Sequence, residues 1–164
     1  MSKLAVIDFD GTIYRGDSMR NFAKFVNPGK YYLSMAQLLV PYLQVAFGSS
    51  DRNALKAKFL QSNFSGITSD ALHAKGKAFF EKNRKHCYPS AIDWIERERA
   101  NGYKILILSG SCKEWLQPFA DTFEAEIITT ELHYDTENKC TGNWVGENLV
   151  GLAKLEALKK YLSE

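Results

Sequence analysis

The chain has 164 residues, of which 45% are apolar and 24% charged, and its formal net charge is +2. These values are typical of one ordinary globular core with room for an inserted subdomain, and they give no indication of a nucleic-acid partner. Cys87, Cys112 and Cys140 are odd in number and lack CxxC spacing, so we expect reduced thiols and neither a disulfide framework nor a zinc site. The apolar run before Asp8 is too short for a signal peptide, and we expect a cytoplasmic protein.

The first predicted element is a strand that ends at two carboxylates. The apolar run within residues 4–9 predicts a strand buried on both faces. Asp8 and Asp10 end this strand with one residue between them, and Gly11 and Thr12 follow as a turn. In an open α/β sheet, chemistry collects at the carboxyl ends of the strands, and paired acids there suit Mg²⁺, which keeps several of its waters. The alternative is an ordinary strand-end turn, in which Asp is common.

Residues 19–86 have a helical pattern and are far longer than a crossover between parallel strands requires. We therefore predict an inserted helical cap over the carboxyl end of the first strand, where it can exclude water and select substrate. The second helix, residues 31–47, carries no charge, and neither do the residues up to 50. This run is long enough for a membrane span, but Pro41 and its polar residues favour a buried cap helix. A helix that faces lipid or an apolar substrate is the alternative.

The second half of this helical segment is rich in Lys and Arg. Such a charge pattern indicates a solvated helix face or, alternatively, a surface that attracts an anionic substrate.

The pattern returns to a sheet after the helical segment. Pro89 suits the first turn of a helix, and Asn101-Gly102 ends it. Residues 103–111 then predict a second buried parallel strand, which ends in Ser-Gly-Ser. We expect Ser111 to cap a helix over residues 112–121, whose N-terminus is a natural site for an anion.

The last third of the chain completes the α/β pattern. A third strand is predicted at residues 126–129, followed by a hairpin excursion over 131–145 with turns at 137–138 and 142–143. A final helix begins near residue 151. The leucines expected on its buried face are Leu152, Leu155, Leu158 and Leu162.

Asp8-Phe9-Asp10-Gly11-Thr12 resembles the first motif of the haloacid dehalogenase superfamily of phosphatases and phosphotransferases. The resemblance implies that Asp8 attacks phosphorus to form an aspartyl-phosphate and also binds Mg²⁺. It implies that Asp10 acts as general acid and then as general base, with its carbonyl oxygen on the metal. It also implies that Gly11 and Thr12 belong to the phosphate-binding residues, with the backbone N–H groups of Phe9 to Gly11 assisting.

Two later positions match the same family. Ser109 corresponds to the Ser or Thr that holds a phosphoryl oxygen, and the N–H of Gly110 is expected to assist it. Lys154 matches the Lys that pairs with the nucleophile and the phosphate, although a lone helical Lys is otherwise usually solvent-exposed. The Gly-Asp-Ser of residues 16–18 is similar to a segment that faces the site in the phosphoserine-phosphatase-like branch, and it suits a helix N-cap equally well.

The family's fourth motif, an acidic turn on the strand after the final helix, has no counterpart in this sequence. We therefore expect weak Mg²⁺ binding through Asp8 and Asp10. In the family's sheet order the missing strand lies beside the first one, so strand 4–9 is expected to be an apolar edge. Either the chain is a fragment of a longer protein, or a partner such as a second copy covers that edge.

Taken together, these patterns predict a doubly wound, Rossmann-like α/β core over residues 1–14 and 87–164, with a helical cap over 15–86. The resemblance implies Mg²⁺-dependent hydrolysis of a small phosphate monoester. One alternative is a catalytically impaired protein of the same fold with a binding or regulatory role. Another is a signalling receiver that accepts phosphate on Asp, which the long cap and the Gly-Thr after Asp10 argue against.

Overall fold

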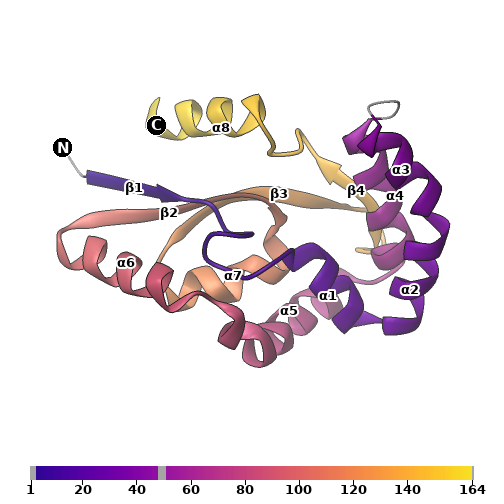
Figure 1. Ribbon diagram of the computed structural model, residues 1–164, viewed down its shortest axis with the longest axis horizontal. Helices are drawn as coiled ribbons and strands as arrows, with labels where there is room; N and C mark the ends of the chain where they lie inside the picture. Colours follow the sequence, from indigo (N-terminus) through magenta and orange to yellow (C-terminus); the bar gives the residue numbers. More distant parts are fainter. Residues whose placement is uncertain (1–2, 48–50, 164) are drawn as a thin grey trace.

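The computed structural model describes residues 3–47 and 51–163, and these form a sheet with helices on both of its faces (Figure 1). The sheet has four strands: Lys3–Ile7 (β1), Tyr103–Cys112 (β2), Glu126–Tyr134 (β3) and Cys140–Val145 (β4). They lie in the order β1-β2-β3-β4, with the first three parallel and β4 antiparallel to β3. This arrangement confirms the predicted Rossmann-like α/β fold class.

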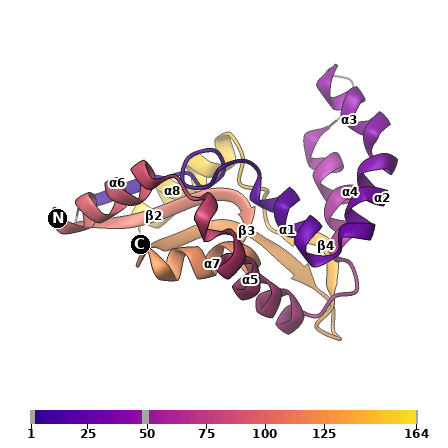
Figure 2. The ribbon, with the colours of Figure 1, turned by 60° about the horizontal axis from the view of Figure 1, so that its bottom comes forward.

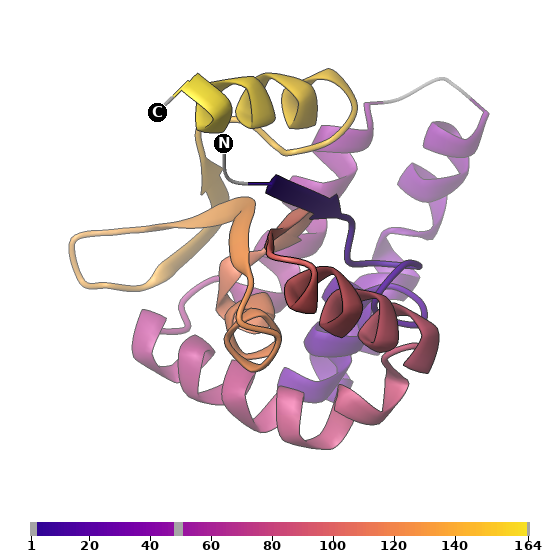
Figure 3. The same cartoon turned by 90° about the vertical axis from the view of Figure 1, so that its left-hand side faces the viewer.

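The helices divide between the two faces of the sheet and one end of it. Their bounds are Ser18–Val26 (α1), Pro28–Gln37 (α2), Leu39–Ala46 (α3), Arg52–Phe64 (α4), Ser69–Asn83 (α5), the 3₁₀ turn Arg84–His86 (η1), Pro89–Ala100 (α6), Lys113–Thr122 (α7) and Leu152–Ser163 (α8). Helices α6 and α7 cover one face and α8 lies over the other (Figures 1 and 3). Helices α1 to α4 gather at the end of the sheet toward which β1 points.

β1 is shorter and less buried than the sequence predicts. The prediction of a strand buried on both faces over residues 4–9 is wrong, because β1 ends at Ile7 and Val6 is 39% exposed. In the described residues β1 pairs only with β2, so it lies at an edge of the sheet and one side of it stays open. Phe9, just beyond the strand, is fully buried.

The predicted helix over residues 31–47 is two helices, α2 and α3, separated at Leu38. Pro41 gives the reason: its ring would clash with the carbonyl group four residues earlier, so α2 cannot continue through it, whereas the first turn of a new helix accepts it. Residues 48–50, at the end of the uncharged run, lie outside the described residues. Within the described ranges, no helix is long and apolar enough to span a membrane.

The hairpin in the second half of the chain differs in part from expectation. β3 continues to Tyr134 and β4 includes Gly142 and Asn143, so the predicted turn at 142–143 is wrong. The other predicted turn, at 137–138, is confirmed: the chain reverses near Asn138, whose φ is 59°.

The predicted buried face of α8 is also wrong. Leu152 is 78% exposed, Leu155 and Leu162 are exposed as well, and none of the described α8 residues is fully buried. Helical spacing shows that these leucines share a face, but it does not show that another element covers that face.

One aromatic cluster joins the helical segment to the sheet region. The ring of Phe9 lies 5.1 Å from that of Phe119 on α7, and Phe22 on α1 stacks 4.9 Å from Trp115, also on α7. Phe79 on α5 contacts both Phe22 and Phe119. The division into a core of residues 1–14 and 87–164 and a cap of residues 15–86 stays a prediction, and this cluster extends across its boundaries.

Candidate active site

A cavity of about 320 Å³ lies at the carboxyl ends of β1 and β2. It brings together five of the seven residues singled out in the sequence, namely Asp8, Asp10, Ser109, Gly110 and Lys154. We call it the Asp8 cavity. Its position follows from the parallel pairing of β1 with β2, which places the ends of both strands at the same edge of the sheet.

Asp8 and Lys154 are in direct contact across 146 positions of sequence. The Nζ of Lys154 lies 2.8 Å from Oδ1 of Asp8, and the backbone N–H of Phe9 donates to the same oxygen at 2.8 Å. The Asp8 side chain is 46% exposed, so its carboxylate is accessible from the cavity. The arrangement sets a cation beside the carboxylate at the place where an anionic group of a ligand would enter.

Asp10 is partly buried and lies at the end of a chain of hydrogen-bond donors. Ser111 Oγ donates to Asp10 Oδ2 at 2.5 Å, and Ser111 and Ser18 hydroxyls are 3.0 Å apart. The indole N–H of Trp115 donates to Ser18 Oγ at 3.0 Å. Because an indole nitrogen only donates, the chain has one direction, from Trp115 through Ser18 and Ser111 to the carboxylate. The backbone N–H of Ser18 donates to Asp10 Oδ1 at 2.7 Å.

The pKa of Asp10 is raised above its ordinary value. Burial is the largest cause, because it disfavours the charged carboxylate, while the hydrogen bonds from Ser111 and Ser18 act in the opposite direction. A carboxyl group that is fixed in place and holds its proton more strongly than usual suits the transfer of a proton.

The predicted cap role of Ser111 is wrong. Helix α7 begins after Cys112, whose side chain makes no capping hydrogen bond, and the Ser111 hydroxyl is directed to Asp10 instead. Asp17 combines the two roles that the sequence left open. Its carboxylate accepts the Arg20 N–H at 2.9 Å as the N-cap of α1, and its side chain also lines the Asp8 cavity.

Gly11 and Thr12 are not brought into the cavity. Both are exposed in the turn after Asp10, where the Gly11 N–H donates to the Tyr14 carbonyl and the Thr12 N–H to the Phe9 carbonyl. Gly11 has a φ of 76°, which favours glycine at this point of the turn. In this structure the two residues shape the turn that carries Asp10.

Lys56 on α4 is a site residue that sequence reasoning did not single out. Its Nζ donates to the Gly110 carbonyl at 2.7 Å, to Asn148 Oδ1, and to Thr130 Oγ1 at 3.4 Å. Burial lowers the pKa of this ammonium group. In the sequence Lys56 is one of many cations in the helical segment, and only the packing of α4 against the sheet region distinguishes it.

The oxygen atoms of Asp8 and Asp10 are the kind of donor that Mg²⁺ prefers. Among the described residues no group of three or more His, Cys, Asp or Glu side chains is arranged to hold a metal ion. Mg²⁺ is commonly bound through one or two carboxylates together with waters and a substrate phosphate, and the accessible Asp8 carboxylate fits that mode.

Comparison with protein families identifies the chain. The family described as haloacid dehalogenase-like hydrolase matches residues 5–164. The chain is a haloacid dehalogenase-like hydrolase. The match covers nearly the whole sequence, and it confirms the family predicted from Asp8-Phe9-Asp10-Gly11-Thr12. A comparison of this hydrolase with curated proteins finds no match.

Solved structures support the fold of this hydrolase. A protein of unknown function from Bordetella pertussis Tohama I has a TM-score of 0.84 and 19% identity, covering 99% of this chain and 75% of that one. A HAD family hydrolase from Salmonella enterica serovar Typhi gives 0.71 and 17%, covering 99% and 51%. A phosphoserine phosphatase, described as a phospho-aspartyl intermediate analogue, gives 0.66 and 18%, covering 99% and 71%. This chain therefore spans between half and three quarters of these proteins.

Proposed function

We propose that this chain is a Mg²⁺-dependent phosphatase that hydrolyses a small phosphate monoester through an aspartyl-phosphate on Asp8. The observation that carries the proposal is the contact of Lys154 with Asp8 in a cavity that also contains Asp10 and Ser109. Membership of a hydrolase family supports the reaction class.

In the first step, an oxygen of Asp8 attacks phosphorus, and the bond from phosphorus to the leaving oxygen breaks. The carboxyl group of Asp10 gives its proton to that leaving oxygen. In the second step Asp10 accepts a proton from a water molecule that attacks phosphorus, which releases inorganic phosphate and restores Asp8. Lys154 offsets the negative charge that would otherwise hold a phosphate away from Asp8.

Asp8 and the backbone carbonyl group of Asp10 would hold Mg²⁺. When bound, the ion would neutralise charge on the transferring phosphoryl group. Ser109, which lies near the carboxyl end of β2 and is buried, would orient a phosphoryl oxygen, and Lys56 donates to the neighbouring Gly110 carbonyl.

The first test replaces the nucleophile. Asp8→Asn should remove turnover of p-nitrophenyl phosphate in the presence of Mg²⁺, because a neutral amide is a poor nucleophile. Asp51→Asn is the matched control, since Asp51 caps α4 away from the cavity and Asn is an equally good N-cap. Full turnover by Asp8→Asn would contradict the assignment. Binding of phosphate ligands without turnover in the unmodified chain would favour the alternative, a binding or regulatory protein.

The second test addresses the proton carrier. Asp10→Asn should lower kcat for a substrate with a poor leaving group by about 10²–10⁴-fold, the usual contribution of a general acid or base. The loss should be smaller for p-nitrophenyl phosphate, whose leaving group needs less protonation. Equal losses for the two substrates would argue against proton transfer by Asp10.

A further inference from the structure

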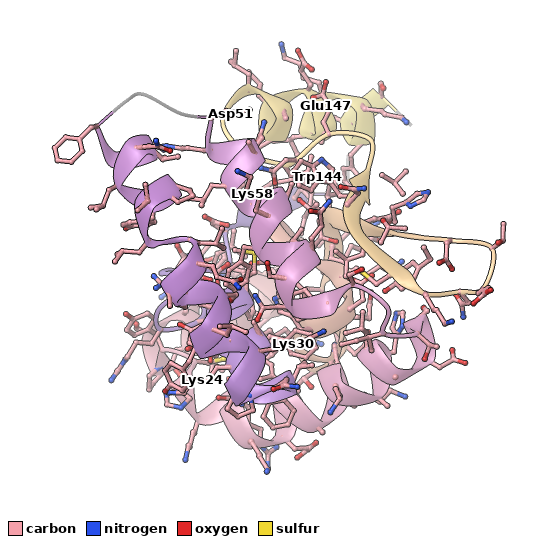
Figure 4. All side chains as sticks on the ribbon, turned by 90° about the vertical axis from the view of Figure 1, so that its right-hand side faces the viewer. Lys24, Lys30, Asp51, Lys58, Trp144 and Glu147 are labelled. Atoms are coloured by element: carbon pink, nitrogen blue, oxygen red, sulfur yellow. The ribbon has the colours of Figure 1, made fainter. Side chains whose placement is uncertain are left out.

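A second cavity of about 300 Å³ adjoins the Asp8 cavity and lies among helices α1 to α4. The two cavities share the lining residues Asp17, Met19 and Lys56. A molecule whose phosphate reaches Asp8 therefore has the second cavity directly beside it. Figure 4 views this end of the molecule, where helix α4 packs against strand β4. We call this second space the apolar cavity, because most of its wall is apolar.

Its apolar side chains come from four helices or their borders. They are Met19, Met35, Leu38, Tyr42, Leu55 and Phe59.

Two charged residues of this wall, Lys56 and Asp17, already make hydrogen bonds to other groups of the protein. Lys56 has three ammonium donors, and three acceptors take them: the Gly110 carbonyl, Asn148 Oδ1 and Thr130 Oγ1. What Lys56 presents to the apolar cavity is therefore its aliphatic stem. Asp17 accepts a backbone N–H as a helix cap.

Arg20 and Arg52 complete the wall, and both are exposed. The guanidinium group of Arg20 lies 3.7 Å from the sulfur of Met35, so it covers apolar surface at the rim and does not supply a buried polar partner. A polar group inside the cavity would lose its water and find few partners, which is costly.

We propose that the apolar cavity binds the organic part of the substrate, and that this part is an alkyl or aryl chain. The inference depends on the proposed phosphatase function, because the phosphate of the same molecule is assigned to the Asp8 cavity. An alkyl chain would displace water from the six apolar side chains without leaving a polar group unpaired. A leaving group with ammonium and carboxylate charges would have to bury them against the same surface.

The alkyl chain of the substrate could belong to a free amphiphile or to a lipid in a bilayer. Beside the cavity, helices α2 and α3 expose large apolar side chains to solvent. These are Tyr32, Leu33, Leu39, Val40, Leu43 and, just after α3, Phe47. Both sources share the chemistry of a phosphate monoester on an apolar chain, and the form in which the substrate is presented distinguishes them.

The test compares ethyl, butyl and octyl phosphate with phosphoserine. We expect kcat/KM to rise by about fourfold for each methylene that the cavity buries, and octyl phosphate to exceed phosphoserine. Equal values from ethyl to octyl, or a preference for phosphoserine, would overturn the inference. Alkylphosphonates, which cannot be hydrolysed, give the same comparison by calorimetry. If phosphatase activity is absent, their affinities still show whether the cavity selects a chain, so the two proposals fail separately.

Two neighbouring residues of α3 provide the variant and its matched control. Tyr42 lines the apolar cavity, whereas Leu43 is similarly exposed but does not line it. Tyr42→Ser should lower the ratio of octyl to ethyl phosphate in kcat/KM by about tenfold, and Leu43→Ser should leave that ratio unchanged. Equal effects of the two substitutions would contradict a specific role for the cavity.

A second arm of the experiment decides whether the alkyl chain of the substrate comes from a free amphiphile or from a lipid. Octyl phosphate is supplied as free monomer, and hexadecyl phosphate is supplied in phosphatidylcholine vesicles. Faster turnover of the vesicle form identifies a lipid, and faster turnover of the monomer identifies a free amphiphile; either result supports the inference. If the protein hydrolyses p-nitrophenyl phosphate but turns over neither the monomer nor the vesicle form, the inference is overturned.

Discussion

Two pairs of helices in the segment between β1 and α6 meet the rest of the molecule in different ways. Helices α1 and α5, which we call the anchored pair, pack into the aromatic cluster with α7. Helices α2 and α3, the open pair, project away from the sheet (Figure 2). Helix α5 buries Leu72, Gly76, Phe79 and Phe80, whereas α2 buries only Ser34 among its described side chains.

This difference separates the proposed chemistry from the proposed choice of substrate. The anchored pair carries Ser18, which donates to Asp10 through its backbone N–H and connects Trp115 to Ser111. The open pair supplies Met35 from α2 and Tyr42 from α3 to the apolar cavity, and Leu38 between the two helices also lines it. A proton carrier needs a fixed position, whereas a pocket for a flexible chain tolerates helices that few buried contacts hold.

The largest expected difference between the two pairs concerns a single leucine in each. Leu72→Ala on α5 should lower the free energy of unfolding by about 2–5 kcal/mol, because Leu72 is fully buried and its loss leaves a cavity. Leu33→Ala on α2 should change it by less than about 0.5 kcal/mol, because Leu33 is already 60% exposed. Urea unfolding of both variants gives the comparison. Similar losses would show that α2 is packed as closely as α5.

The next expected difference in stability concerns one glycine in each pair of helices. A Cβ atom added at Gly76 would overlap the backbone carbonyl oxygen of Glu114 on α7, so Gly76→Ala should cost about 1–3 kcal/mol in spite of the better helix propensity of Ala. Gly29→Ala on α2 is the matched control. Its Cβ would meet nothing closer than Asn27 Oδ1 at 3.5 Å, so it should be neutral or slightly stabilising. Thermal melts that rank the two variants in the reverse order would contradict close packing of α5 on α7.

The sequence was sufficient for the features that depend on local pattern. Apolar runs located the central parts of β1, β2 and β3, and the acids after β1 and Ser109 near the end of β2 lie around one cavity. This worked because parallel strands place their carboxyl ends together. Lys154 was located only through the family resemblance, since helical spacing alone favours a solvent-exposed lysine.

Features that depend on tertiary packing were not visible in the sequence. Lys56 reaches the Gly110 carbonyl only because α4 lies beside the sheet region, and Ser18 reaches Asp10 only because α1 begins there. The leucines of α8 show the opposite case, in which a feature that was predicted from the sequence is absent from the structure. Their spacing predicted a buried face, yet burial also requires a covering element, and helical periodicity contains no information about one.

Near the contact of the anchored pair with α7, one buried carboxyl group lacks a hydrogen-bond partner for one of its oxygens. Glu114 is buried in the first turn of α7, where its Oε1 accepts the Tyr134 hydroxyl at 2.8 Å. Its Oε2 is buried without a hydrogen-bond partner. Burial is the main cause that raises the pKa of Glu114. The Tyr134 hydrogen bond and the charge of His73 on α5 act in the opposite direction, and Glu131 on β3 raises the pKa further.

The smallest expected effect on the free energy of unfolding concerns Glu114. Its substitution should stabilise the protein, whereas the substitutions of Leu72 and Gly76 should destabilise it. Because the pKa of Glu114 is higher in the folded than in the unfolded chain, folding favours the protonated form, and stability is lost as pH rises through the folded pKa. At neutral pH the buried charge therefore remains a cost. Glu114→Gln should raise the free energy of unfolding at pH 7 by about 1 kcal/mol, the low end of the cost of an unsatisfied buried group. The gain should vanish below the ordinary Glu pKa of 4.5.

Glu81→Gln, at an exposed position of α5, is the matched control and should show no such pH dependence. Denaturant unfolding of both variants between pH 4 and pH 8 provides the measurement, and a gain that persists unchanged at pH 4 would show that charge burial is not its cause.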